Sequence, residues 1–221
     1  MTLTRRNLMA LSSGLAVLPV SLALQANLAW ADAATTTTPP AAGAIQDFGI
    51  GDTAAKVVID EYLSFTCPHC RRFHDEVYPK LKGDYIDKGL VRLNYHEVYF
   101  DKYGLWGAML ARCGGEMRYI GIVDMLYDKQ TDWAGTDDPT VAVDQLKKIG
   151  VIAGLDEATA DACLKDQTTA QALVAHYQSS IATAFPNDSF KGTPSFIMNG
   201  ATSGNMAYED LKKIIDDDLA K

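Results

Sequence analysis

One short motif, Cys67-Pro68-His69-Cys70, constrains what this chain can fold into more than any other feature. Residues 57–65 before it are β-branched and aromatic and predict a strand that ends at the first cysteine. Pro68 is the residue type favoured at the first position of a helix. The predicted helix carries an apolar stripe at four-residue spacing, formed by Phe73, Val77, Leu81 and Tyr85. The motif therefore sits where a strand turns into a helix.

The predicted helix continues into a second strand. Pro79 lies inside the helix and should kink it, because its ring removes one backbone hydrogen bond. Gly89 ends the helix, and residues 90–95 begin the next strand. A strand, a helix and a strand in this order predict a right-handed parallel unit.

Helical spacing replaces the strand pattern from about Gly104 to Phe185. The breaks between the helices of this stretch are Gly114-Gly115, a Gly-Thr-Asp-Asp-Pro run at 135–139, and Gly150. Strand signals return at residues 194–198, and Asn199-Gly200 predicts a type I′ hairpin into a short strand at 201–203. The apolar residues that mark a final helix are Leu211, Ile214, Ile215 and Leu219.

This order of elements predicts an α/β chain: a thioredoxin fold with an inserted all-helical domain. The thioredoxin-like domain would comprise residues 45–103 and 186–221, and the helical insertion residues 104–185.

The N-terminal residues predict export. Arg5-Arg6 precedes a moderately apolar stretch at 8–28, and Ala29-Trp30-Ala31 has the small residues that a signal peptidase requires. Residues 1–31 therefore read as a signal peptide of the twin-arginine kind, with an ordinary Sec signal as the alternative. Residues 32–44 are low in complexity and predict a disordered tether.

The charge balance speaks against nucleic acid as a partner. Removal of residues 1–31 takes away two arginines and leaves 18 basic against 28 acidic side chains. Nothing in such a chain offsets the repulsion of phosphates.

The cysteine motif predicts thiol–disulfide exchange. Cys67 stands at the start of a helix, where unpaired N–H groups and the helix dipole stabilise a thiolate. His69 lies between the two sulfurs and can add a donor or a positive charge. Stabilising the reduced thiolate form makes the disulfide a stronger oxidant. We expect Cys67 to be the nucleophile and Cys70, one turn inside the helix, to be the resolving thiol.

Two other interpretations of the motif are weaker. Half of a zinc site would need a second cysteine pair, but Cys113 and Cys163 lie far apart and form no second CxxC. A purely structural disulfide is possible in an exported protein, although a CxxC at the start of a helix is typical of exchange catalysts. The sequence predicts neither a metal nor a cofactor.

Glu61 and the pair Thr193-Pro194 each leave two interpretations open. Glu61 shares the apolar face of its strand, so it is either buried with a raised pKa, suited to moving protons for Cys70, or paired with a nearby Lys or Arg. Pro194 is either an ordinary trans loop residue or a cis residue that leaves the Thr193 backbone free for an extended substrate.

Taken together, these residues resemble the DsbA-like disulfide oxidases over about residues 45–220. The resemblance implies that Glu61 is the family's buried acidic residue and that Pro194 is its cis-proline next to the sulfurs. Thr193 departs from the branched apolar residue best known there in enterobacterial oxidases, which puts the redox poise and the choice of partner in doubt.

The same resemblance extends to the second cysteine pair. Cys113 and Cys163 are similar to a pair found in some alphaproteobacterial-type relatives, which implies a structural disulfide; two separately buried thiols are the alternative. Three histidines, His74, His96 and His176, have no metal-ligand spacing and are predicted to be surface or ordinarily packed residues.

The resulting hypothesis is a periplasmic oxidase that donates its Cys67–Cys70 disulfide to reduced exported proteins. By resemblance, a DsbB-type membrane partner linked to quinone would re-oxidise it. The short stretch between Ala31 and Ile45 leaves no room for a dimerisation domain, which favours a monomer. The alternatives are a disulfide isomerase or reductase of the same fold and, less favoured, a non-catalytic chaperone or metal-delivery module.

Overall fold

The structure is a computed structural model that describes residues 45–221. The predicted signal peptide at 1–31 and the predicted tether at 32–44 lie outside the described residues.

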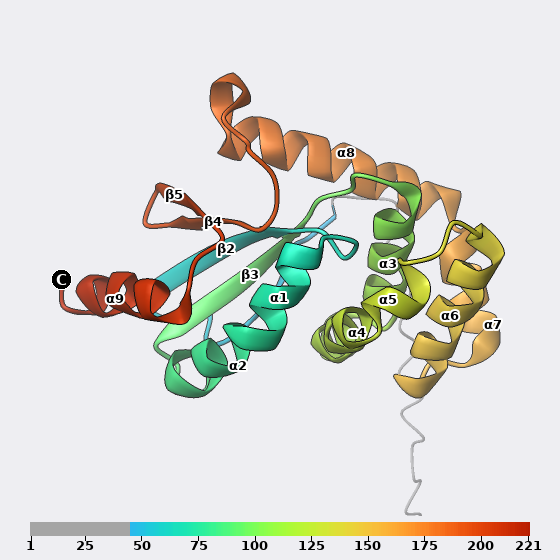
Figure 1. Cartoon of the computed structure of the whole chain (residues 1–221), viewed down its shortest axis with the longest axis horizontal. Helices are drawn as coiled ribbons and strands as arrows, with labels where there is room; N and C mark the ends of the chain where they lie inside the picture. The colour runs from blue at the N-terminus through green and yellow to red at the C-terminus, as the bar shows by residue number, and fades with distance from the viewer. Residues whose placement is uncertain (1–44) are drawn as a thin grey trace, which may run out of the picture. The chain divides into compact units, whose positions relative to one another are not determined.

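A five-stranded mixed sheet with the order β1-β3-β2-β4-β5 forms the centre of the described part (Figure 1). Its strands are β1 (Phe48–Ile50), β2 (Val57–Leu63), β3 (Val91–Glu97), β4 (Ser195–Met198) and β5 (Ala201–Gly204). The predicted parallel unit is formed by β2 and β3, which pair from Val57 opposite Val91 to Leu63 opposite Glu97. The other pairings are antiparallel. Strand β1 was not predicted, because three residues are too few to show a period.

Three short helical segments follow the motif. They are α1 (Pro68–Glu76), α2 (Tyr78–Leu81) and a π-helical turn (Lys82–Ile86). The break between α1 and α2 falls at Val77, two residues before Pro79, as expected for a residue that cannot donate its backbone N–H. The predicted apolar stripe is buried along all three segments.

The chain is helical from Lys102 to Ala184, where the sequence predicted helices at 104–185. The helices are α3 (Lys102–Cys113), α4 (Glu116–Asp128), α5 (Gln130–Trp133), α6 (Pro139–Ile152), α7 (Glu157–Lys165) and α8 (Gln167–Ala184). Figure 1 shows α3–α7 beside the sheet and α8 leading back toward β4. The predicted fold class, a thioredoxin fold with an inserted helical region, is confirmed.

The chain returns to the sheet through a 3₁₀ turn (Pro186–Asp188) and ends in α9 (Tyr208–Leu219), which contacts α2 and β2. Between β4 and β5, Asn199 and Gly200 both have positive φ, 49° and 78°, as a type I′ turn requires.

Within residues 45–221, no helix combines the length and the apolar character needed to cross a membrane.

Candidate active site

The Cys67 sulfur lies at the start of α1. Cys67 is the residue before the first turn, with extended backbone angles, and its carbonyl accepts the first helical hydrogen bond, from the Arg71 N–H at 3.1 Å. Its side chain is half-buried, whereas that of Cys70 is fully buried. Strand β2 therefore delivers one accessible thiol and one enclosed thiol to the same helix end.

The two thiols differ sharply in acidity. A hydrogen bond from the Cys70 thiol, together with the Thr193 side chain and the backbone N–H groups of His69 and Cys70, lowers the pKa of Cys67 to about 5, against partial burial. Burial raises the pKa of Cys70, and the neighbouring charges of Cys67 and Glu61 raise it further. At neutral pH the pair is therefore a Cys67 thiolate beside a protonated Cys70.

Thr193 contacts the Cys67 sulfur from the other side of the site. The Thr193–Pro194 peptide is cis, and the Thr193 carbonyl oxygen lies 3.3 Å from the Cys67 Sγ. The Thr193 hydroxyl is buried and has no partner among the described residues while Cys67 is a thiol, so it can turn its proton toward a thiolate.

Glu61 lies beneath the motif on β2 and is 3% exposed. Burial alone acts on its carboxyl group and raises its pKa to about 8. Of the two interpretations left open by the sequence, the described residues therefore support an unpaired buried acid. At neutral pH it is mostly protonated and can donate a proton.

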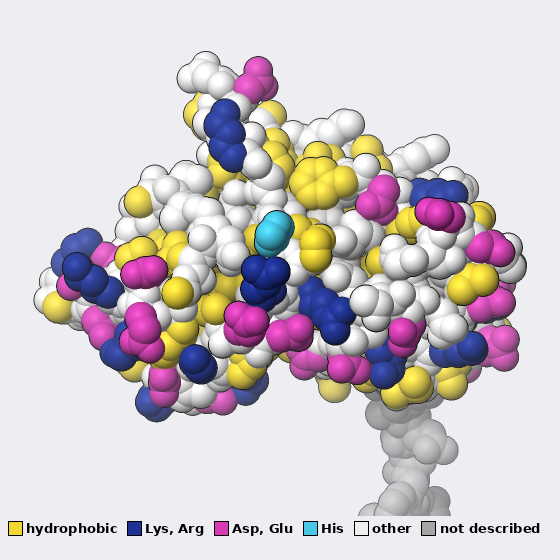
Figure 2. Space-filling model, viewed as in Figure 1, with side chains coloured by type: hydrophobic (Ala, Val, Ile, Leu, Met, Phe, Trp, Pro, Cys, Tyr) yellow, Lys and Arg dark blue, Asp and Glu magenta, His cyan; other side chains and the backbone are white. Residues whose placement is uncertain are grey.

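His69 and Pro68 are exposed at the start of α1. Figure 2 shows hydrophobic, histidine and basic side chains next to one another over this end of α1. A surface of this kind can receive an extended polypeptide without any deep pocket.

Gln130 in the helical region and Asp101 just before it hold the motif and the residues preceding it in place, and sequence reasoning missed both. The Gln130 side-chain amide on α5 donates to the carbonyl oxygens of Phe65 at 2.8 Å and Cys67 at 3.0 Å. Asp101 caps α3 through the Gly104 N–H at 2.8 Å and accepts the Thr66 hydroxyl at 2.8 Å. The Asp101 cap precedes the helix and could have been found; nothing near Gln130 signals its role.

The second cysteine pair is bridged. Cys113 on α3 and Cys163 on α7 form a disulfide at a sequence separation of 50. A loop of that length contributes about 4 kcal/mol in the chain-entropy account. This bridge ties two helices of the helical region and does not reach the motif.

The three histidines that were predicted to be unremarkable each pair with aspartate. His74 lies 3.0 Å from Asp124. His96 lies 3.0 Å from Asp47 and 3.1 Å from Asp60, and His176 lies 2.9 Å from Asp47. In the described part of the chain, no group of three or more His, Cys, Asp or Glu side chains could hold a metal ion.

Comparison with known proteins gives the family. The thioredoxin family profile matches residues 44–217. A Bacillus cereus protein named as disulfide bond formation protein D is 31% identical over 198 residues, which cover 80% of this chain and 79% of that protein. A Rickettsia felis protein named as a protein-disulfide oxidoreductase is 30% identical over 171 residues, and the match covers 77% of this chain but only 59% of that longer protein.

Solved structures agree on the fold. The crystal structure of alpha-DsbA1 from Wolbachia pipientis has a TM-score of 0.71 at 24% identity, covering 80% of this chain and 93% of that one. BdbD from Bacillus subtilis, in its oxidised form, has a TM-score of 0.68 at 22% identity, with 79% and 94% coverage. The strand, motif and helix described above are therefore set in a fold shared with these proteins, and the chain belongs to the thioredoxin family, among its DsbA-like members.

Proposed function

We propose that this protein is a thiol:disulfide oxidoreductase that introduces disulfide bonds into exported proteins through Cys67 and Cys70. The observation that carries the proposal is the opposite shift of the two thiol pKa values within one helical turn. A stabilised Cys67 thiolate is a good leaving group, and it favours the reduced form of the pair.

The reaction needs only the two cysteines and a proton donor. A substrate thiolate attacks the Cys67 sulfur of the Cys67–Cys70 disulfide, and Cys70 departs as a thiolate that takes a proton from Glu61. The second substrate thiolate then attacks the first substrate sulfur and releases the Cys67 thiolate. Two electrons pass from the substrate dithiol to the cysteine pair, and the substrate leaves with a new disulfide.

The low pKa of Cys67 supports oxidation as the direction, because a disulfide whose reduced form is stabilised tends to accept electrons. Isomerisation or reduction is the second candidate. The observation behind it is the likeness of fold to the crystal structure of a protein-disulfide isomerase from Novosphingobium aromaticivorans, with a TM-score of 0.65 at 21% identity.

The same proposal includes the cellular location, the redox partner and the oligomeric state. Export through the twin-arginine route would place the protein in the periplasm, where reduced exported proteins are its substrates. A DsbB-type membrane oxidase linked to quinone would return the electrons to the respiratory chain, and the protein would act as a monomer.

Equilibration with glutathione buffers, followed by refolding of a reduced protein substrate, tests the direction. We expect the Cys67–Cys70 pair to be reduced by glutathione mixtures that leave thioredoxin oxidised, and we expect the oxidised protein to form disulfides in the substrate. A Cys113→Ala/Cys163→Ala variant is the control, since it isolates the motif. A potential near that of thioredoxin, about −270 mV, with no oxidation of substrate would overturn the proposal.

A further inference from the structure

The turn that joins β2 to α1 is held by the helical region as well as by its own backbone. Within the turn, the Cys67 N–H donates to the Ser64 carbonyl oxygen at 3.1 Å. The same oxygen accepts the Tyr127 hydroxyl of α4 at 3.4 Å. The Gln130 amide of α5 donates to the carbonyl oxygens of Phe65 at 2.8 Å and Cys67 at 3.0 Å. The residue that carries the reactive sulfur is therefore fixed from outside the thioredoxin-like core.

The bond between Gln130 and Phe65 lies in the protein interior. Both residues are buried, and within residues 45–221 no other donor bonds the Phe65 carbonyl oxygen. A buried carbonyl group that loses its partner costs the free energy of its desolvation. The turn therefore has a strong preference for the position in which the amide reaches it.

Helix α5 gives the Gln130 amide a fixed position. The helix has four residues, and Gln130 is the first and Trp133 the last. Trp133 is fully buried, and its indole N–H donates to the Leu126 carbonyl oxygen of α4 at 2.9 Å. Its ring also lies against Gly107 of α3, where a Cβ would come within 3.1 Å of it. Because α5 is anchored to α3 and α4 in this way, the amide meets the turn from a firm support.

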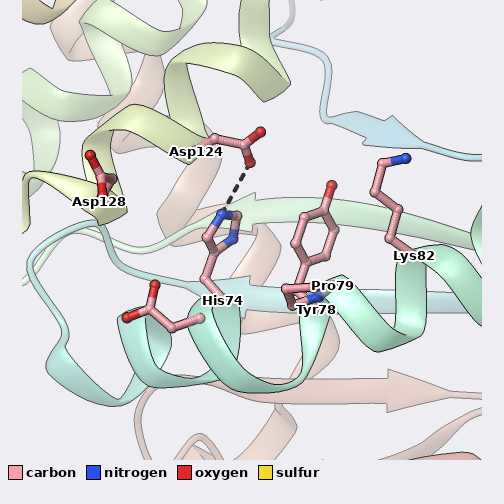
Figure 3. Close-up of a pocket in the computed structure, with 7 residues that line it drawn as sticks. His74, Tyr78, Pro79, Lys82, Asp124 and Asp128 are labelled. Atoms are coloured by element: carbon pink, nitrogen blue, oxygen red, sulfur yellow. Dashed lines mark ion pairs between the residues drawn. The ribbon is translucent and has the colours of Figure 1, made fainter.

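The helical region contacts α1 at a second place that does not involve the turn. About one helical turn beyond Cys70, the His74 Nε2 lies 3.0 Å from the Asp124 Oδ1 of α4. Figure 3 shows this pair at a pocket between α1 and α4, with Tyr78 beside His74. The residues that line the pocket include none of those at 64–67. The same two parts of the molecule thus meet through one contact with the turn and one without it.

The alignment of Cys67 with α1 matters for exchange. Cys67 has extended backbone angles, φ −78° and ψ 121°, and α1 begins at the next residue, Pro68. The helix dipole and the free N–H groups at the start of a helix stabilise a negative charge there, and the effect falls off within the first turn. A rotation of Cys67 away from the helix axis would therefore weaken the stabilisation of the thiolate that forms when the disulfide is reduced.

We propose that Gln130 is a positioning residue for thiol exchange, which holds Cys67 in line with the start of α1 and thereby makes the Cys67–Cys70 pair a stronger oxidant. This inference rests on the proposed function and concerns the control of its direction. The amide bonds two backbone carbonyl oxygens, so it acts through the geometry of the turn and takes no part in bond formation or proton transfer. Through α5, the helical region contributes to the redox potential of a motif that lies in the thioredoxin-like part of the chain.

Gln130→Met in the full-length protein tests the positioning role, because methionine keeps the length of the side chain and removes both hydrogen-bond donors. We expect the cysteine pair of this variant to be about fivefold harder to reduce with glutathione, since the loss of one hydrogen bond changes an equilibrium by about that factor. The pKa of Cys67, followed by the ultraviolet absorbance of the thiolate, should rise at the same time. Gln130→Asn, whose amide is one methylene shorter, takes its place if circular dichroism shows that Gln130→Met does not fold.

Asp124→Asn is the matched control, because it weakens the other contact between α1 and the helical region and leaves the turn untouched. Urea unfolding of the oxidised and the reduced form of each variant is the second measurement. A purely structural Gln130 would stabilise both forms equally. A positioning residue stabilises the reduced form more, so its loss should lower the free energy of unfolding of that form more.

The outcomes separate the positioning role from the proposed function. A shifted glutathione equilibrium in Gln130→Met, with an unchanged one in Asp124→Asn, supports the positioning role. An unchanged equilibrium in Gln130→Met, or equal shifts in both variants, overturns it. Failure of the unmodified protein to oxidise substrate thiols would refute the proposed function, while the ratio of the glutathione equilibria of variant and wild type would still report on Gln130.

Discussion

Two buried glutamates on neighbouring strands, Glu61 and Glu97, show how differently one sheet can treat the same side chain. Glu97, at the end of β3, is 6% exposed and lies 2.7 Å from the Nε of Arg112. The hydroxyls of Tyr119 and Tyr99 donate to the same carboxylate at 2.7 and 2.9 Å. Glu61 on β2 is 3% exposed, and burial is the cause that acts on its pKa.

This difference gives Glu97 a structural role and leaves Glu61 free for the proposed chemical role. Arg112 also donates to the Gln46 carbonyl oxygen at 2.7 Å, so the Glu97 network ties α3 to β3 and to the segment before β1. Hydrogen bonds to a charged partner are shorter and stronger than neutral ones, which suits this network to holding the two elements together. Glu61 lacks such a partner, so it holds a proton at neutral pH and remains able to give it up.

Loss of Arg112 should produce the largest effect on stability. Arg112→Met leaves the Glu97 charge buried and unpaired, which we expect to lower the free energy of unfolding by about 3–5 kcal/mol. Urea unfolding at pH 7 measures it. Lys165→Met, which removes an exposed partner of Asp161, is the control and should change little. A loss below about 1 kcal/mol for Arg112→Met would mean that the ion pair with Arg112 does not set Glu97 apart from Glu61.

Removal of the Glu61 carboxyl group should change how the free energy of unfolding depends on pH. Its pKa is raised from 4.5 to about 8, so the folded protein keeps a proton that the unfolded chain loses between these values. The free energy of unfolding of the wild type should therefore fall as pH rises through this window, by up to about 1.4 kcal/mol per pH unit. Glu61→Gln should lack that fall and exchange thiols more slowly.

Unfolding of the wild type and Glu61→Gln at pH 4.5, 6 and 8 measures the difference between the two curves. The thiol exchange rate over the same range is the second readout. Parallel stability curves combined with equal exchange rates would remove Glu61 from the mechanism.

His96, like Glu97, lies beside partners of opposite charge. Its contribution to the free energy of unfolding should be lost at a higher pH than that of Glu61. Burial works to lower the pKa of His96, but hydrogen bonds to Asp47 and Asp60 raise it from 6.5 to about 9. The stability it contributes is fully present below pH 6.5 and is lost as pH rises through 9. His96→Gln should remove a contribution on the order of 2–3 kcal/mol at pH 6 and much less at pH 9. The His96 ring stacks on that of Tyr62, with ring centres 4.6 Å apart. An equal loss at both pH values would show that the imidazole acts through this stacking instead of through its charge.

Much of the fold could be predicted because it depends on local pattern. The β-branched run of β2, the four-residue stripe after Cys70 and the Asn199-Gly200 turn each place apolar or turn residues at a period that one element satisfies. Strand β1 escaped prediction because its three residues pair only with β3, a partner about 45 residues away. The helical region could be predicted as helical, but not how its helices contact the motif.

The residues of the candidate site also fall into two groups, those that local sequence pattern reveals and those that only the fold brings together. Cys67, Cys70, Glu61 and Thr193-Pro194 could be selected from motif, alternation and resemblance. Gln130 could not, because its importance comes from the two backbone carbonyl oxygens that its side chain reaches across the site. The aspartate partners of the histidines were missed for the same reason, since Asp47 and His176 are separated by 129 residues.

The smallest effect should come from Thr193, which contacts the sulfur without carrying a charge. Thr193→Val keeps the shape of the side chain and removes the buried hydroxyl that can donate to the Cys67 thiolate. We expect the pKa of Cys67 to rise and the disulfide to become less oxidising, by about 1 kcal/mol for one lost hydrogen bond.

The thiolate absorbance at 240 nm, titrated with pH, measures the pKa. Thr202→Val, on the exposed strand β5, should leave it unchanged. A Cys67 pKa that stays the same in Thr193→Val would mean that the acidity of Cys67 comes from the start of the helix and from Cys70 alone. The low pKa of the active-site thiol would then depend on α1 and its own motif, and not on the strand β4 side of the site.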